Sequence, residues 1–261
     1  MAVINVHDLH YTYPDNNQAL KGITFTVNTG EKVALVGANG SGKSTLLLHL
    51  AGAIKPQNGT ITTAKTGLIF QDADDQILMP SVIEDVAFSL VANGMKVAQA
   101  HERALNMLEA LGISHLAKRV PHQLSGGEKR MVSLAGVLIT SPDILLLDEP
   151  TANLDPKSRR RVINFLREND KTIMLATHDL DMALDICTRA LILNHGTISA
   201  EGVLPEIFTK REILEANNLE LPLRFTKQMA ETQRFELWED CSSYALQAHA
   251  FDRSATFPPR K

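Results

Sequence analysis

The segment GANGSGKST, residues 37–45, combines residue types and a spacing that suit phosphate binding. Its glycines let backbone N–H groups turn inward toward phosphate oxygens, and the helix expected from TLLLHLAG adds positive potential at its start. We expect Lys43 to reach the β and γ phosphates of a nucleotide and Ser44 to ligate magnesium. A chance glycine-rich turn would lack the apolar strand before it and the helix after it. The predicted nucleotide-binding residues of this phosphate loop (P-loop) are Gly37, Asn39, Gly40, Ser41, Gly42, Lys43, Ser44 and Thr45.

Two acids follow a second apolar run, in ILLLDEP at residues 144–150. Asp148 is placed to hold magnesium through its water shell, and Glu149 is placed to polarise a water that attacks phosphate. An acidic pair can also do no more than end a strand before Pro150. The P-loop upstream favours the catalytic interpretation, because hydrolysis needs acids as well as a phosphate site.

His178 and Gln71 each close a short apolar run, in LATHD and LIFQDADDQ. A polar residue at a strand end is usually an ordinary solvent-facing side chain. Ligand sites gather at the carboxyl ends of parallel strands, however. Both side chains are therefore candidates for contact with the γ-phosphate or the attacking water.

A second glycine-rich segment, HQLSGGEKR at residues 122–130, also opens a predicted helix. The Ser125 hydroxyl and the N–H groups of Gly126 and Gly127 would form another site for an anion. The question is why one chain has two such sites.

The elements that must position these residues indicate an α/β fold. Unbroken apolar runs at residues 32–37, 143–148 and 172–177 are typical of parallel strands buried on both faces. Residues 1–30 alternate apolar and polar side chains, which predicts antiparallel strands with one exposed face. ALILNHGTISAEG predicts a hairpin with its turn near His195 and Gly196.

Between the first two buried strands the sequence is rich in helix signals rather than strand signals, which predicts an inserted helical subdomain over about residues 75–140. Ser81 and Glu84 predict a capping box. Gly112 ends the next predicted helix, whose apolar face carries Ala100, Ala104, Leu108 and Leu111. We expect one domain over residues 1–221 and leave the polar residues 222–261 as an unassigned C-terminal extension.

The bulk composition excludes several classes of protein. The chain has 261 residues, of which 44% are hydrophobic and 21% charged, and its net charge of -4 gives no general attraction to nucleic acid. No apolar run approaches the ~20 residues that span a bilayer, so a membrane role must come through a partner. The two cysteines have no disulfide-rich spacing and the nine histidines no metal-site pattern. No signal segment opens the chain, so we expect a cytosolic protein.

Together these motifs resemble those of the ATP-binding-cassette (ABC) ATPases over about residues 1–205. The family's order and approximate spacing are matched by Tyr13 in YTYP, the P-loop, Gln71, LSGGE, ILLLDEP, TANLD and His178. LSGGE is the discriminating motif, because other P-loop enzymes lack it. The resemblance implies a P-loop NTPase core with a parallel sheet, an N-terminal antiparallel β subdomain and the helical insertion. It also implies ATP and Mg²⁺ as cofactors.

The resemblance explains the second anion site by a head-to-tail dimer, in which LSGGE of one subunit caps the ATP on the P-loop of the other. It implies that adenine stacks on Tyr13, that Gln71 links magnesium to the partner contact, and that Glu149 is the general base. The implied capping and dimer-contact residues are Ser125, Gly126, Gly127, Glu128 and Asp155, and the implied metal ligands are Ser44, Gln71 and Asp148. Two departures weaken these contacts: Glu128 replaces a frequent glutamine, and Ala152 and Asn153 replace a usual serine and alanine.

The stretch FQDADDQILMPSVIEDVAFSL is similar to the ATPases of energy-coupling-factor importers, which take up cobalt, nickel or vitamins. In that family the segment after Gln71 forms a groove for a helix of the membrane subunit. The alternative is that Asp72, Asp74 and Asp75 form an ordinary solvated acidic loop. The sequence thus predicts the motor of such an importer for cobalt or nickel, peripheral to the cytoplasmic face of the membrane. Its expected partners are a transmembrane subunit and an identical or similar ATPase, without nucleic acid.

Three other functions remain open at this point. The chain could drive an importer for another substrate such as a vitamin, or be a soluble ABC ATPase that acts outside transport. A regulatory module that only senses ATP is the third, but such a module would be expected to have lost Glu149 or His178, and both are present.

Overall fold

The computed structural model describes residues 1–226, in which Met1–Glu220 form one compact unit and a second unit begins at Leu221. The C-terminal extension predicted from residue 222 lies mostly outside the described residues. Within the described part, no helix is both long and apolar enough to cross a membrane.

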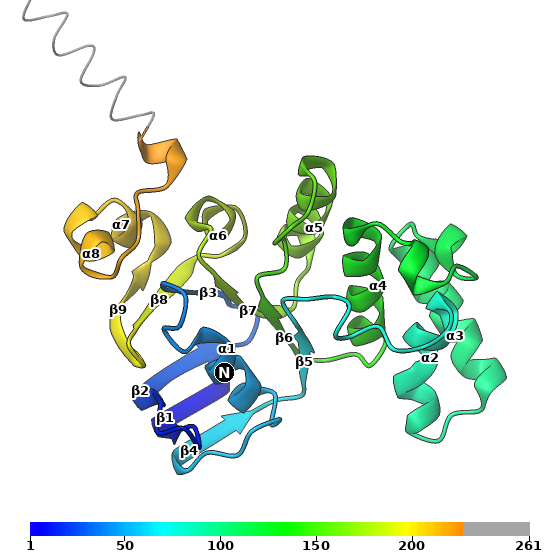
Figure 1. Cartoon of the computed structure of the whole chain (residues 1–261), viewed down its shortest axis with the longest axis horizontal. Helices are drawn as coiled ribbons and strands as arrows, with labels where there is room; N and C mark the ends of the chain where they lie inside the picture. Colours follow the sequence, from blue (N-terminus) through cyan, green and yellow to red (C-terminus); the bar gives the residue numbers. More distant parts are fainter. Residues whose placement is uncertain (227–261) are drawn as a thin grey trace, which may run out of the picture. The chain divides into compact units, whose positions relative to one another are not determined.

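Two β-sheets form the core of the first unit (Figure 1). The antiparallel sheet has the order β2-β1-β4, from Gln18–Asn28, Ala2–Thr12 and Asn58–Thr63. The larger sheet has the order β5-β6-β7-β3-β8-β9, from Thr66–Ile69, Ile144–Asp148, Thr172–Thr177, Lys32–Val36, Arg189–Asn194 and Thr197–Val203. All neighbours in the larger sheet are parallel except β8 and β9, which form the predicted hairpin with His195 and Gly196 at its turn.

The buried apolar runs are confirmed as β3, β6 and β7. Every residue of β6 and β7 is buried, as expected for strands covered on both faces. In β2 the side chains alternate, with Ile23, Phe25 and Val27 inside and their neighbours exposed, as predicted for a one-faced antiparallel sheet.

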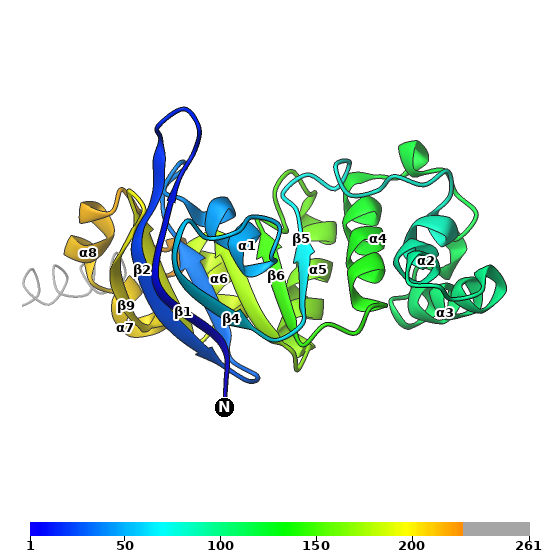
Figure 2. The ribbon, with the colours of Figure 1, turned by 90° about the horizontal axis from the view of Figure 1, so that it is seen from below.

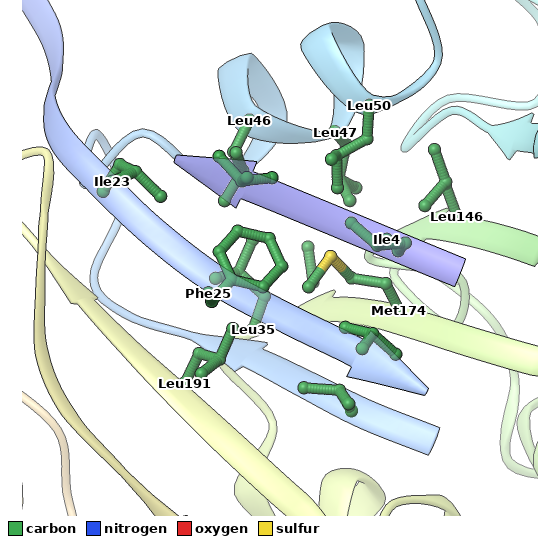
Figure 3. Packing of buried hydrophobic residues seen from close by; sticks show 14 of the residues in the cluster. Ile4, Ile23, Phe25, Leu35, Leu46, Leu47, Leu50, Leu146, Met174 and Leu191 are labelled. Atoms are coloured by element: carbon green, nitrogen blue, oxygen red, sulfur yellow. The ribbon is translucent and has the colours of Figure 1, made fainter. Parts of the chain in front are cut away.

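Helix α1 (Lys43–Leu50) packs between the two sheets and joins them into one core (Figure 1). Its Leu46, Leu47 and Leu50 are at most 1% exposed and belong to the same apolar cluster as Ile4 of β1 and Phe25 of β2 (Figure 3). The other end of the cluster is built by strands of the parallel sheet, from which Leu35, Leu146, Met174 and Leu191 contribute. Burial of these side chains therefore fixes the P-loop helix against the sheet that carries the predicted acids.

The helices α2 (Val82–Ala92), α3 (Val97–Ala110) and α4 (Gly126–Leu138) pack on one another beyond the edge strand β5 (Figure 2). Ala100, Ala104 and Leu108 are fully buried along α3, as predicted, whereas Leu111 is only half-buried at the end of the helix. Gly112 has a φ of 66°, the left-handed conformation expected of a helix stop. Two short 3₁₀ turns, Ser114–Leu116 and Pro121–Gln123, connect α3 to α4.

The remaining helices cover the sheet on the side away from α1. They are α5 (Pro156–Glu168), α6 (Leu180–Ile186), α7 (Leu204–Phe208) and α8 (Arg211–Ala216). Helix α6 contacts β3 and β7, and α7 contacts β8 and β9. The parallel sheet is thus covered on both faces.

Two local predictions were wrong. The Ser81 hydroxyl donates to the Glu84 carboxylate at 2.6 Å instead of accepting a backbone N–H, so the predicted capping box is absent. The region before residue 75 also contains β4, a strand that the helix-rich pattern did not predict, because most residues of NGTITT are exposed and polar.

Core packing gives a direct test of the two-sheet arrangement. We expect Leu146→Ala to lower the free energy of unfolding by about 3 kcal/mol, because Leu146 is fully buried between the sheets. The matched variant Leu105→Ala removes the same atoms from a side chain that is 42% exposed on α3, and should cost less than about 1 kcal/mol. Urea unfolding followed by circular dichroism measures both, and equal losses would contradict the described core.

Candidate functional site

A cavity of about 520 Å³ opens at the carboxyl ends of β3, β6 and β7. It brings together eleven of the predicted site residues, which come from five separate segments of the chain. These are Tyr13, Asn39, Gly40, Gly42, Lys43, Ser44, Thr45, Gln71, Asp148, Glu149 and His178. The strands responsible are neighbours in the order β6-β7-β3, so the segments that follow them meet at one edge of the sheet.

The P-loop connects β3 to α1 and has backbone conformations that require glycine. Gly42 caps the helix with a φ of 109°, and a Cβ there would lie 2.7 Å from the Ala19 carbonyl oxygen. A Cβ on Gly37 would lie 2.2 Å from the Leu193 carbonyl oxygen, inside van der Waals contact. Gly37 and Gly42 are thus also demanded by the packing of the loop against its neighbours.

Two predicted P-loop residues do not line the cavity. Gly37, the first residue of the loop, packs against the Leu193 carbonyl, and Ser41 is 5% exposed with its N–H donated to the Ala38 carbonyl at 3.2 Å.

Lys43 is buried at the base of the cavity. Its Nζ donates to the carbonyl oxygens of Gly37 at 2.7 Å and Ala38 at 3.1 Å. Burial lowers the pKa of Lys43, and the negative charges of Glu149 and Asp148 partly offset that effect. The buried cation can bind an anion while the two carboxylates attract a metal ion, so both can be bound at this place together.

Asp148, the last residue of β6, is 8% exposed. Burial raises the pKa of Asp148, a hydrogen bond from Ser44 lowers it, and the charge of Glu149 raises it further. The Ser44 hydroxyl, the Asp148 carboxylate and the Gln71 amide offer oxygen ligands, which suit Mg²⁺. Within residues 1–226 there is no cluster of three or more His, Cys, Asp or Glu that would favour another kind of metal centre.

Glu149 is held rigidly just beyond β6. Its φ of 42° is in the left-handed region, which is rare for a non-glycine residue and is found preferentially at functional sites. Its carboxylate accepts three hydrogen bonds: one from Thr177 Oγ1 at 3.0 Å, and two from His178, through N at 2.9 Å and Nδ1 at 2.6 Å. A carboxylate has roughly four acceptor sites, so one remains for a further donor such as water.

Tyr13 stands at the mouth of the same cavity and is fixed from two sides. Its hydroxyl lies 3.0 Å from Thr45 Oγ1, and its ring makes an edge contact with Tyr11 at 4.9 Å between centroids. Tyr11 in turn contacts the buried ring of His49 at 4.7 Å. An aromatic ring held in this way can present a face to a nucleotide base.

The second predicted anion site does not line this cavity, although the cavity beside it shares Gln71 and Asp148 with the first. Gly126 lines another cavity of about 530 Å³ with the Gln71 loop and residues 152–154, and none of Ser125, Gly126, Gly127, Glu128 or Asp155 lines the first. Ser125 and Glu128 form a reciprocal capping box at the start of α4. The hydrogen bond from the Ser125 N–H lowers the pKa of Glu128. Gly127 has a packing role as well, since a Cβ there would lie 2.1 Å from Ser158 Oγ.

Asp155 is exposed and caps α5. Its Oδ1 accepts the N–H groups of Lys157 at 3.0 Å and Ser158 at 3.1 Å, and hydrogen bonds from Ser158 lower the pKa of Asp155. Its predicted place in a dimer contact stays a prediction.

Arg130 is a residue of this region that sequence reasoning missed. It is 2% exposed on α4 and donates from Nη1 to Phe70 O and from Nη2 to Gln71 O, each at 2.5 Å. Burial lowers the pKa of Arg130, while Asp72 and Asp148 raise it. The only signal in the sequence was a lone arginine two residues after LSGGE.

Comparison with known proteins is consistent with this geometry. The ABC transporter family model matches residues 20–152. A Geobacter sulfurreducens protein named as an ABC transporter ATP-binding protein is 45% identical, over 85% of this chain and 94% of that protein. The energy-coupling factor transporter ATP-binding protein EcfA of Methanothermobacter thermautotrophicus is 40% identical, over 84% of this chain and 77% of that protein.

Among solved structures, cbiO1 from Clostridium perfringens, described as part of the ABC transporter complex cbiONQ, has a TM-score of 0.73. It is 35% identical, and the match covers 88% of this chain and 99% of that one. The matched family model spans both the P-loop and the paired acids, and relatives are matched over nearly their whole length. The chain therefore belongs to the ABC transporter family and is one of its ATP-binding, ATP-hydrolysing subunits.

Proposed function

We propose that this chain is the motor subunit of an energy-coupling-factor importer for cobalt or nickel ions, bound to the cytoplasmic face of the membrane through a transmembrane partner. The observation that carries the proposal is the segment after Gln71, which resembles that importer class in sequence and leaves apolar side chains exposed. The similarity to EcfA and to cbiO1 supports the same class. An importer for a vitamin, or a soluble ABC ATPase, is the alternative.

The exposed apolar side chains lie on α2 and in the segment that leads from β5 to it. Leu78 is 75% exposed, and its N–H is tied to the Asp85 carboxylate at 2.8 Å. Phe88 is 49% exposed and follows Asp85 by three residues on α2, so the two side chains are neighbours on the helix surface. Phe70, 39% exposed, precedes Gln71 in the second cavity. An apolar surface next to the loop that reaches the nucleotide suits a helix of a membrane subunit.

The proposed hydrolysis uses the fixed carboxylate of Glu149 as the base. Glu149 would use its remaining acceptor site to bind the attacking water and take its proton, as the water oxygen bonds the γ-phosphorus and the bond to the β-phosphate oxygen breaks. Lys43 and the P-loop N–H groups would hold the β and γ phosphates, and His178 would contact the γ-phosphate. Ser44, Asp148 and Gln71 would hold Mg²⁺, which neutralises charge on the phosphates.

The separation of the two anion sites supports a head-to-tail dimer of this chain with itself or with a similar ATPase. Ser125 and Gly126 are exposed at the positive end of α4 but lie outside the P-loop cavity of their own chain. We therefore infer that they cap a triphosphate on a second subunit, which would explain why one chain has two sites.

The proposed base gives the first test. We expect Glu149→Gln to lower kcat at least about a hundredfold, because the amide cannot accept the water proton, while ATP binding persists. Colorimetric release of phosphate measures turnover, and size-exclusion chromatography with ATP measures the trapped dimer. Turnover close to that of the unchanged protein would count against Glu149 as the base.

The composite site can be tested by mixing two inactive variants. Lys43→Ala disables the P-loop, and Ser125→Arg blocks the capping helix, so each variant alone should lose nearly all turnover. A mixed dimer contains one intact site, formed by the P-loop of the Ser125→Arg subunit and the capping helix of the Lys43→Ala subunit. We expect it to recover up to about half of the normal rate per dimer. No recovery in a mixture shown to form mixed dimers would contradict capping between subunits.

The membrane partner and its cargo need the whole complex. Tagged chain purified from gently solubilised membranes should bring down a membrane-embedded subunit, and proteoliposomes of that complex should take up Co²⁺ or Ni²⁺ when ATP and Mg²⁺ are supplied. Leu78→Glu should reduce recovery of the membrane subunit at least about tenfold, because it places a charge in an apolar contact. Val203→Glu, at a side chain that is 51% exposed at the end of β9, is the control.

Each remaining outcome selects an alternative. Uptake of a vitamin without metal-ion uptake would support the vitamin importer and reject the metal cargo. Sedimentation with ribosomes in the absence of any membrane subunit would reject the importer.

A further inference from the structure

Thr177 contacts the proposed base from inside the core. It is the last residue of β7, it has no exposed surface, and its Oγ1 lies 3.0 Å from Glu149 Oε2. A buried hydroxyl so close to an ionised carboxylate is a charge-assisted hydrogen bond, which is stronger than one between neutral groups.

The hydrogen of the Thr177 hydroxyl has a defined direction. The Asp179 N–H donates to Thr177 Oγ1 at 3.0 Å, which occupies its acceptor side and leaves the hydroxyl hydrogen for Glu149. Asp179 is itself fixed, because it caps α6 through Met182 N at 2.9 Å and accepts from Arg159 Nη2 at 2.5 Å. The carboxylate of Glu149 is therefore at the end of a chain of hydrogen bonds anchored on two helices.

The other two hydrogen bonds to Glu149 come from His178, one from its backbone N–H directly after the strand and one from its imidazole. The His178 side chain is 63% exposed and lies beyond the end of the strand. Thr177, by contrast, is paired with Val36 of β3 inside the parallel sheet. Of the two side-chain donors, Thr177 is the one whose position the sheet itself determines.

We propose that Thr177 is a positioning residue for ATP hydrolysis, whose hydroxyl holds the Glu149 carboxylate so that its free acceptor site faces the attacking water. The inference rests on the proposed role of Glu149 as the general base. Thr177 acts through Glu149, so its removal should affect the chemical step and not the binding of nucleotide.

The test uses steady-state kinetics on the full chain with three substitutions of Thr177. Thr177→Val keeps the shape and removes the hydroxyl, and we expect kcat to fall about tenfold with KM for ATP unchanged. Thr177→Ala removes the hydroxyl without placing a methyl group beside the carboxylate, and it should lower kcat by a similar factor. It replaces the valine variant in the test if that variant does not fold. Thr177→Ser keeps the donor and should stay within about twofold of the unchanged protein.

Thr172 provides a matched control on the same strand. It is also buried, and its Oγ1 also accepts a backbone N–H, from Gly30 at 2.9 Å, but it lies at the opposite end of β7 from Glu149. Thr172→Val should therefore lose comparable thermal stability without a change in kcat. Equal losses of kcat in the Thr172 and Thr177 valine variants, or a serine variant as slow as the valine variant, would overturn the inference.

A double variant separates this inference from the proposed function. In a Glu149→Gln background Thr177→Val should have no further effect on the residual rate, because the carboxylate on which it acts is gone. A further tenfold loss would overturn the positioning role while leaving Glu149 as the base. If Glu149→Gln alone retains turnover, it is the proposed base that fails.

Discussion

The parallel pairing of β6, β7 and β3 is the constraint on which the rest of the site depends. Its register sets Asp148 beside Ala176 and Thr177 beside Val36, so the three strands end at the same level. The acids, the histidine and the P-loop leave these ends and meet in one cavity. Burial of both faces of the strands maintains that register, since a slip would move apolar side chains out of contact.

The same edge of the sheet brings several buried charged side chains together. Lys43, Asp148 and Glu149 are each less than a tenth exposed. The two carboxylates partly offset the lowering of the Lys43 pKa by burial, and the charge of Lys43 partly offsets the raising of the Asp148 pKa by burial. Glu149 also has a backbone conformation that costs about 1–3 kcal/mol and persists only because its surroundings hold it. A site arranged in this way is preorganised: its charges and donors are in place before a substrate arrives.

The helical part of the molecule is tied to this edge through the Gln71 loop. Arg130 of α4 holds the carbonyls of Phe70 and Gln71, and Lys129 of the same helix contacts Asp74 at 2.5 Å. Arg161 of α5 binds the carbonyl of Leu111 at the end of α3. A displacement of α4 must therefore move the Gln71 backbone or break charged hydrogen bonds, which links the helices α2 to α4 physically to the nucleotide cavity.

Short sequence patterns predicted the features that depend only on residues close together in the chain. The P-loop, the three buried parallel strands and the stop at Gly112 were predicted, because a run of apolar residues or a glycine at a helix end leaves a direct mark on the sequence. The same kind of reasoning missed β4, whose exposed residues lack an apolar pattern, and it could not distinguish Ser81, which bonds a carboxylate, from Ser125, which forms the box.

The sequence by itself determined the chemistry on offer: a phosphate loop, two acids, and a second helix start suited to an anion. Only the tertiary structure decided that these line two different cavities, which share Gln71 and Asp148, that Arg130 secures the Gln71 loop, and that Thr177 holds Glu149. The reason is physical, because these contacts join residues far apart in the chain. Such pairs meet only when the parallel sheet and the buried core set the distance between them.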